Sequence, residues 1–419
     1  MKKTIFILIP ILFFFKNIQA QALQGLLVKD ALKANREKLY KNLVNNAITK
    51  NLSYTLTDST EENWIDAFWA MELIRYKSPW ADNCIHTAFD SIEKRSTAFQ
   101  RALMELLYAN YPTAFSKEVE RLLKNTSNEK VFAMCAEYLF IANPLLKNNI
   151  SSIARQKLAK DSGNIFLQQV IYRASLTDSK IILPGFTSLL KQPFFKNAKV
   201  VFSFQRKNRD YPGIVVVRDS AGNFVKDIYG NIFSVPQLAR SISNLPGYLT
   251  NGNTPQGIFR MDGFDTSNSN FIGPTPNIQL TMPVETSIQH FMNDSTITDS
   301  VWTMDWYKKL LPGEWKNYLP IFGTYYAGTA GRTEIIAHGT TINPDYYKGQ
   351  PYYPQTPTLG CLCTKEIWSE EDGHSLQSDQ QKLITALQQA GGANGYYIVI
   401  ELNDEQRPVV MNDILPLLK

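Results

Sequence analysis

The amino-acid sequence predicts an α+β multidomain protein, in which an all-α region with helical-repeat character precedes a mainly β region. Two observations support this prediction. From residue 22 to about 180, apolar side chains recur at helical spacing and strand-like stretches are almost absent. From about residue 195 onward, short runs of β-branched and aromatic residues alternate with Gly, Pro and Asn, as is typical of strands and turns.

The first 20 residues have the features of a secretory signal peptide. Two lysines precede an apolar run from Ile5 to Phe15, and Ala20 supplies a small residue at a plausible cleavage point. The run is too short to span a bilayer, which requires roughly 20 apolar residues. We therefore expect a periplasmic or secreted mature protein that does not remain inserted in a membrane.

Charge and cysteine content exclude two classes of protein. The formal charge is +5, and loss of Lys2, Lys3 and Lys16 with the signal leaves +2. Such a small surplus does not predict binding to nucleic acid or to an anionic membrane. Four cysteines are too few for a disulfide-built scaffold. Cys84 and Cys135 lie in apolar helical patterns and are expected to be core residues or to form one disulfide.

Residues 21–190 are predicted to form the all-α domain. Helices are expected within 96–112 and 129–144, because the apolar side chains of each segment fall on one face. Each segment ends in Ala-Asn followed closely by Pro, at an offset of about 33 residues, which resembles arrays of paired helices. A single irregular bundle is the alternative. No catalytic cluster occurs here, so a protein or glycan partner is expected. The tryptophans of this region are expected to pack in the core or between helices: Trp64, Trp69 and Trp80.

Residues 195–419 are predicted to form the second domain. Its strand-like runs are KVVFSF, GIVVVRDSAGNFV, GIFRMDGF, IQLTMP, EIIAHGT and YYIVIEL. A hairpin turn is expected at Gly222 and Asn223. A helix is expected after Ser378, which forms a capping-box pattern with Gln381, and Gly391 marks its end.

The candidate catalytic residues lie between positions 338 and 363. His338 follows a strand-like run, and Cys361 follows Gly360 at the end of a loop rich in Tyr and Pro. A thiol becomes an effective nucleophile when its pKa is lowered or a neighbouring base takes its proton. His338 is the candidate base, and Gly360 allows backbone N–H groups to approach a developing oxyanion. The pattern predicts acyl transfer through a thioester.

Two alternatives remain open on the pattern alone. His338 and Cys361 need not touch, since they are 23 residues apart. Cysteine and histidine together also bind zinc. Cys361 and Cys363, however, are separated by one residue, whereas common structural zinc sites have at least two residues between their cysteines.

Three motifs then occur in a recognisable order. They are Thr-Pro-x-Gly at 254–257, His-Gly at 338–339 and Thr-Leu-Gly-Cys at 358–361. In this order they resemble the L,D-transpeptidases, the YkuD-type enzymes of the bacterial cell wall. The resemblance covers about residues 200–402 and does not reach the helical region. It departs from the family pattern at Leu359 and Cys363, in a longer His-to-Cys loop, and in an apparent insertion at 261–332.

The resemblance implies a role for each matched residue. Cys361 is the nucleophile, His338 the general base and the Gly339 carbonyl the group that orients the base. Backbone N–H groups at Gly360 and Cys361 face the oxyanion, and Thr358 shapes the turn. The implied substrates are peptidoglycan stem peptides, and the implied reaction needs no cofactor and no metal. Water as the acceptor instead gives an L,D-carboxypeptidase or endopeptidase.

Substrate contacts are expected from two further places. The loop tyrosines, Tyr346, Tyr347 and Tyr353, are expected to form a wall over the thiol. Arg332 is expected either to pair with a substrate carboxylate or to be an ordinary surface arginine. A third class of function also stays open, a cell-wall-binding scaffold whose catalytic half is silent, because the Cys363 thiol lies close enough in sequence to interfere with Cys361.

Overall fold

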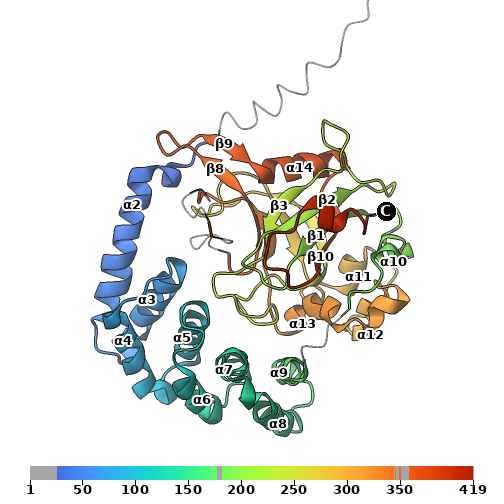
Figure 1. Cartoon of the computed structure of the whole chain (residues 1–419). Coiled ribbons are helices and arrows are strands. Elements are labelled where there is room, and N and C mark those ends of the chain that lie inside the picture. The colour runs from blue at the N-terminus through green and yellow to red at the C-terminus, as the bar shows by residue number, and fades with distance from the viewer. Residues whose placement is uncertain (1–25, 177–181, 344, 346–348, 351–357, 419) are drawn as a thin grey trace, which may run out of the picture.

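The computed structural model describes residues 26–176, 182–343, 345, 349–350 and 358–418. Within them the protein is α+β, with a row of helices wrapping one side of an eight-stranded closed barrel (Figure 1). The predicted signal peptide at 1–20 lies outside the described residues. Among the helices that are described, none combines the length and the apolar character needed to cross a membrane.

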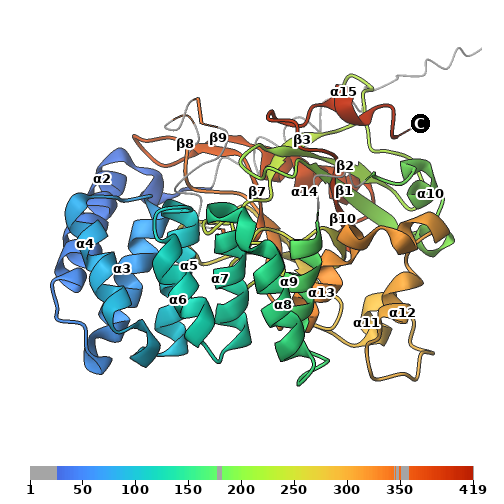
Figure 2. The same cartoon turned by 60° about the horizontal axis from the view of Figure 1, so that its bottom comes forward.

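The N-terminal helices follow one another along an arc beside the barrel, as Figures 1 and 2 show. Several begin at a Ser or Asn whose side chain accepts a hydrogen bond from a backbone N–H three residues later, namely Ser78, Ser96, Asn128 and Asn164. The elements are α2 (Lys33–Asn42), its π-helical continuation η3 (Leu43–Lys50), α3 (Glu61–Leu73), α4 (Pro79–Asp90), α5 (Thr97–Asn110), α6 (Ser116–Asn125), α7 (Glu129–Ala142), α8 (Lys147–Leu158) and α9 (Ile165–Ser175).

The two helices expected from their apolar faces are α5 and α7, which pack against each other. Their predicted inner faces are fully buried: Phe99, Leu103, Leu106, Leu107, Val131, Cys135, Tyr138 and Leu139. The packing prediction holds for Trp64 but is wrong for Trp69 and Trp80, each 41% exposed. Trp69 lies five residues after Trp64 on α3 and so faces the other side of the helix. Cys84 and Cys135 are free thiols.

The barrel strands lie in the order β1-β10-β4-β5-β6-β7-β3-β2. β1 pairs with β10 in parallel, β6 pairs with β7 in parallel, and the other neighbours are antiparallel. The six predicted runs are β1 (Lys199–Gln205), β2 (Gly213–Arg218), β4 (Gly257–Asp265), β5 (Asn277–Thr281), β6 (Ile335–His338) and β10 (Asn394–Glu401). Two short strands that the sequence did not reveal complete the ring, β3 (Val235–Leu238) and β7 (Leu362–Thr364).

Alternate residues of strands from all around the ring form one apolar cluster, which is the barrel interior. Its members include Val201, Phe259, Ile278, Ala337, Leu362 and Tyr397, together with Leu383 and Leu387 of α14 (Asp379–Gln389). The predicted cap of α14 is present, since Ser378 Oγ accepts a hydrogen bond of 2.8 Å from Gln381 N. The predicted hairpin turn after β2 also forms, with Gly222 at φ +91°.

The predicted insertion at 261–332 holds elements of two kinds. β5 lies within it and is a barrel strand between β4 and β6. The remainder forms helices on the barrel's outer surface, α11 (Ile288–Met292), α12 (Met304–Lys308) and α13 (Gly323–Thr329). They share an apolar cluster with α10 (Phe186–Leu190) and α15 (Met411–Ile414) through residues such as Phe186, Phe291 and Ile414.

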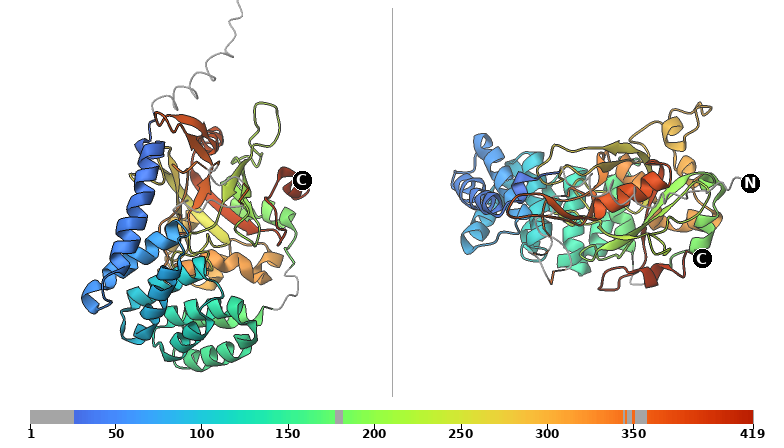
Figure 3. Two further views of the ribbon diagram at one scale, coloured as in Figure 1. Left: turned by 60° about the vertical axis from the view of Figure 1, so that its left-hand side comes forward. Right: turned by 90° about the horizontal axis from the view of Figure 1, so that it is seen from above.

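Two connections join the helices to the barrel. The β3–β4 loop, residues 239–256, places Ile242, Leu245, Tyr248 and Leu249 in the apolar core of the helical region. At the other end, the segment before α2 bonds to the residues around a small two-stranded sheet, β8 (Glu366–Trp368) and β9 (Ser375–Ser378), beside which α2 begins (Figure 3).

Candidate active site

The parallel pairing of β6 with β7 brings together the two ends of the predicted site, His338 and Cys361. Ala337 pairs with Leu362 and His338 with Cys363. Ala337 and Leu362 face the barrel interior, so His338, Cys363 and Cys361 lie on the opposite face, because side chains alternate along a strand. His338 and Cys361 are diagonal neighbours, about 8 Å apart between Cα atoms from ordinary strand spacings.

The His338 ring is buried and held by its own neighbour. Nδ1 lies 2.5 Å from the Gly339 carbonyl oxygen. Donation from Nδ1–H to this acceptor leaves Nε2 with a lone pair, the tautomer that a general base requires. Burial lowers the pKa of His338 to about 4, against a smaller opposing effect of the Gly339 hydrogen bond. The imidazole is therefore neutral at neutral pH.

The Cys361 thiol is half-buried and donates to the Glu334 carbonyl oxygen at 3.7 Å. Burial raises the pKa of Cys361, and a hydrogen bond to the Ile336 backbone and the charge of Arg332 oppose that rise. In this resting arrangement, therefore, the thiol is not activated by a lowered pKa. Within the described part of the chain, no hydrogen bond joins the thiol to the imidazole of His338.

The turn before the thiol is fixed by two of the predicted motifs. Thr254 Oγ1, from the upstream Thr-Pro-x-Gly motif, donates to the Gly360 carbonyl oxygen at 2.8 Å. Thr358 Oγ1 donates to the Arg240 carbonyl oxygen at 2.6 Å. Gly360 has φ +111°, which favours glycine. The three separated motifs therefore meet in one place.

Arg332 lies beneath this turn. Its guanidinium donates to four backbone carbonyl oxygens, those of Gly247 (2.5 Å), Asn253 (2.8 Å), Gly252 (2.5 Å) and Leu359 (3.2 Å). A Cβ added at Gly360 would lie 1.5 Å from Arg332 Nη2. Arg332 is 4% exposed. Both expectations for it are therefore wrong: it is not a surface arginine, and its guanidinium binds backbone carbonyls instead of facing a substrate carboxylate. Burial lowers the pKa of Arg332 to about 10, and the Cys361 sulfur opposes that shift.

A second buried group, Glu366, lies behind the His-Gly pair and was missed from the sequence. A Cβ added at Gly339 would lie 2.0 Å from Glu366 Oε2, so the glycine allows close approach of this carboxyl group. The Ser378 hydroxyl donates to it. Burial raises the pKa of Glu366 to about 7. No local signal marks Glu366 among the acidic residues of its segment.

The remaining predicted residues have different outcomes. Cys363 is 2% exposed and free, with its Sγ 4.0 Å from the Gly339 carbonyl oxygen. Burial raises the pKa of Cys363, and Glu366 adds to the rise. Tyr346, Tyr347 and Tyr353 lie outside the described residues. Over the described ranges, no three His, Cys, Asp or Glu side chains gather as metal ligands would.

Comparisons of the chain with family profiles, with curated proteins and with solved structures find no match.

Proposed function

We propose that this protein is an extracytoplasmic cysteine acyltransferase of the L,D-transpeptidase type, acting on peptidoglycan stem peptides. One observation supports this most strongly. The Thr254 hydroxyl holds the Gly360 carbonyl while paired strands place His338 and Cys361 on one face, so three motifs far apart in sequence converge on one thiol. Chance matches to separate motifs have no reason to converge.

The proposed chemistry begins from a neutral thiol and a neutral imidazole. A rotation of the Cys361 side chain away from Glu334 brings Sγ toward His338, which takes the thiol proton as the sulfur attacks the carbonyl carbon before a terminal D-residue. The C–S bond forms, the C–N bond breaks, and the proton passes to the leaving amine. Backbone N–H groups at Gly360 and Cys361 are the proposed oxyanion donors.

The second half-reaction reverses these roles. The amine of another stem peptide attacks the thioester, His338 accepts its proton, and the Cys361 thiolate leaves and is reprotonated. Arg332 supports both steps as a positioning residue, because its buried positive charge favours the thiolate over the thiol. No metal or redox cofactor takes part in the proposed sequence.

The helical region has a separate proposed role. We propose that residues 21–190 form a repeat-like domain that binds a cell-wall component, and that residues 195–419 form the catalytic domain. The arc of helices from α3 to α9 beside the barrel supports this arrangement (Figure 2).

The test is product analysis with purified disaccharide-tetrapeptide fragments, for the wild type and Cys361→Ala. Cross-linked dimers with release of a terminal D-amino acid, absent in the variant, are expected. Cys361-dependent trimming without dimers would assign the site to a carboxypeptidase. Products that persist in Cys361→Ala, or no products from either protein, would overturn the proposed catalysis and favour a silent, wall-binding protein.

A further inference from the structure

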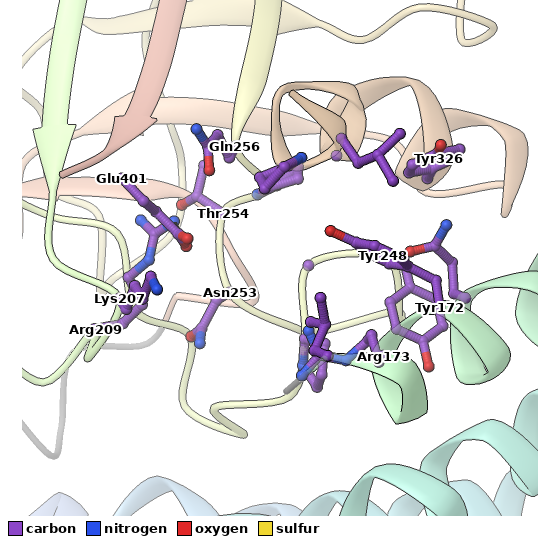
Figure 4. Close-up of a pocket in the computed structure, with 18 of the residues that line it drawn as sticks. Tyr172, Arg173, Lys207, Arg209, Tyr248, Asn253, Thr254, Gln256, Tyr326 and Glu401 are labelled. Atoms are coloured by element: carbon purple, nitrogen blue, oxygen red, sulfur yellow. Dashed lines mark hydrogen bonds and ion pairs between the residues drawn. The ribbon is translucent and has the colours of Figure 1, made fainter. Parts of the chain in front are cut away.

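Glu366 carries a buried carboxyl group that has no part in the chemistry proposed above. It is the first residue of β8, and its relative exposure is 0%. Figure 4 shows a cavity of about 420 Å³ with Tyr172 and Tyr326 on one side and Lys207 on the other. Glu366 does not line this cavity, so a ligand bound there does not account for the carboxyl group. Its neighbours beside the thiol are the residues to consider.

The carboxyl group lies directly against the peptide unit that follows His338. A Cβ added at Gly339 would lie 2.2 Å from Glu366 Cδ and 2.8 Å from Oε1, so a glycine is needed for this contact. Burial raises the pKa of Glu366, and the adjacent Thr340 backbone N–H is one of the groups that oppose the rise. Oε2 has no hydrogen bond of good geometry to any described residue. The carboxyl group is therefore held against one peptide unit with one oxygen unpaired.

That peptide unit joins Glu366 to the imidazole. The Gly339 carbonyl oxygen accepts the hydrogen bond from His338 Nδ1 at 2.5 Å, and the N–H at the other end of the same peptide bond belongs to Thr340. In a trans peptide these two groups point in opposite directions. A negative charge near the N–H end polarises the peptide and makes its carbonyl oxygen a stronger acceptor. An ionised Glu366 therefore favours positive charge on the His338 ring.

The other titratable groups around Glu366 differ from it in charge behaviour. Burial lowers the pKa of His338 to about 4 and raises the pKa of Cys363, so both are neutral in the resting site at neutral pH. Asp379 of α14 is paired with Lys382 at 2.7 Å. Burial raises the pKa of Glu366 to about 7, so this group is mostly protonated at pH 6 and mostly ionised at pH 8.

We propose that Glu366 is a positioning residue for the base, and that its ionised form activates the site as the pH rises. The proposal rests on the proposed function, in which His338 accepts the Cys361 proton. That proton moves from Sγ to Nε2, the Nδ1 proton stays on the ring, and Glu366 remains ionised without taking part in the transfer. The carboxylate stabilises the resulting imidazolium through the peptide between Gly339 and Thr340.

Alkylation of Cys361 by iodoacetamide at pH 6 and pH 8, located by peptide mass spectrometry, tests this without a substrate. Glu366→Gln keeps the size of the side chain and resembles the protonated form. We expect this variant to react within about twofold of the wild type at pH 6 and about tenfold more slowly at pH 8. Glu366→Asp keeps the charge and should retain part of the rate at pH 8. Glu371→Gln, at an exposed residue of the β8–β9 turn, should change nothing.

The direction of the effect separates this role from two others. Faster alkylation of Glu366→Gln at pH 8 would mean that the carboxylate only repels the thiolate. Equal slowing at both pH values would mean that it only supports the fold, and either result overturns the proposal. In a His338→Gln background, Glu366→Gln should no longer slow alkylation, and slowing that persists there would show that the effect does not pass through His338.

Acylation by the disaccharide-tetrapeptide distinguishes this proposal from the proposed function. Acylation of Cys361 with the same pH dependence in the wild type and Glu366→Gln would refute only the role of Glu366. Alkylation that depends on Glu366 as expected, without any acylation, would refute only the transpeptidase chemistry.

Discussion

At the scale of single residues, the site is a thiol whose ionisation is opposed by burial and helped by one cation. Arg332 is buried beside Cys361, with carbonyl oxygens as its hydrogen-bond acceptors and no carboxylate paired with it in the described residues. Its positive charge is therefore only partly neutralised locally. Such a charge favours an anion nearby, and the Cys361 thiol is a neighbouring group able to become one.

Replacing Arg332 with Met should raise the pKa of Cys361 further, which slows its alkylation at pH 8 by about tenfold. Arg332→Lys keeps the charge and should restore part of the rate. Iodoacetamide labelling across pH, followed by peptide mass spectrometry, measures both quantities, with the half-buried Cys84 as the internal reference thiol. A fall in rate without any change in the pKa would mean that Arg332 acts only as a brace for the loop.

The buried His338 makes a prediction about acid stability. Its folded-state pKa is about 4, below the ordinary 6.5, so between these values the unfolded chain binds a proton that the folded chain does not. Stability due to His338 is complete above pH 6.5 and is lost as the pH falls toward 4, by up to about 3 kcal/mol.

Urea unfolding of the wild type and His338→Gln at pH 7.5 and pH 5 measures this effect. The wild type should lose more free energy of unfolding than the variant. Glu366, whose pKa is raised to about 7, contributes with the opposite sign in both proteins and cancels in the difference. An equal loss in the two proteins would show that His338 stays accessible to protons in the folded state.

At the scale of elements, the β3–β4 loop connects the helices to the turn before Cys361. Tyr248 donates to Glu137 Oε1 of α7 at 2.9 Å, and Asn251 donates to Glu105 Oε2 of α5 at 2.9 Å. The same loop supplies Thr254 to Gly360 and three carbonyls to Arg332. Helix packing and thiol geometry therefore depend on one element.

Glu137→Gln tests this dependence. Glu137 is 1% exposed, and the substitution removes the charge that pairs with Arg173 while keeping an acceptor for Tyr248. We expect a loss of about 1–3 kcal/mol in the free energy of unfolding, together with slower alkylation of Cys361. A matched change at Glu120, a half-exposed residue of α6 paired with Lys124, should have almost no effect. Destabilisation with unchanged Cys361 reactivity would show that the packing of the helices does not control the geometry of the thiol.

Sequence patterns predicted elements better than they predicted contacts between elements. Periodicity located α5, α7, α14 and six barrel strands, because each carries its own apolar pattern. β3 was missed because Pro236 and Gln237 interrupt its apolar residues, and β7 because three residues are too short to show alternation. The motifs located the Gly360 turn, but nothing near Arg332 showed that loop carbonyls would surround it. Glu366 was missed for the same reason.

At the scale of the whole molecule, the helical core and the barrel share a loop and are expected to unfold together. Leu245 and Leu249 of the β3–β4 loop are fully buried in the helical core, although both belong to the chain between two barrel strands. Opening either part therefore exposes apolar surface of the other. A single cooperative transition follows from this arrangement.

Leu249→Ala should lower the free energy of unfolding by about 2–5 kcal/mol and shift the whole transition. Far-ultraviolet circular dichroism follows the helices, and near-ultraviolet signals follow buried aromatic residues such as Trp315 and Trp368. The two midpoints should coincide in the wild type and in the variant. Helical signal lost at a lower urea concentration than the aromatic signal would show that the two parts unfold independently.

The central claim is that Cys361, and not Cys363, carries the acyl group. The most direct measurement is the intact mass of the purified protein after rapid quenching with a disaccharide-tetrapeptide, followed by mapping of the modified peptide. We predict an adduct equal to the substrate minus its terminal D-residue, located on Cys361, present in Cys363→Ser and absent in Cys361→Ala. An adduct on Cys363, or none on either thiol in the wild type, would contradict the assignment.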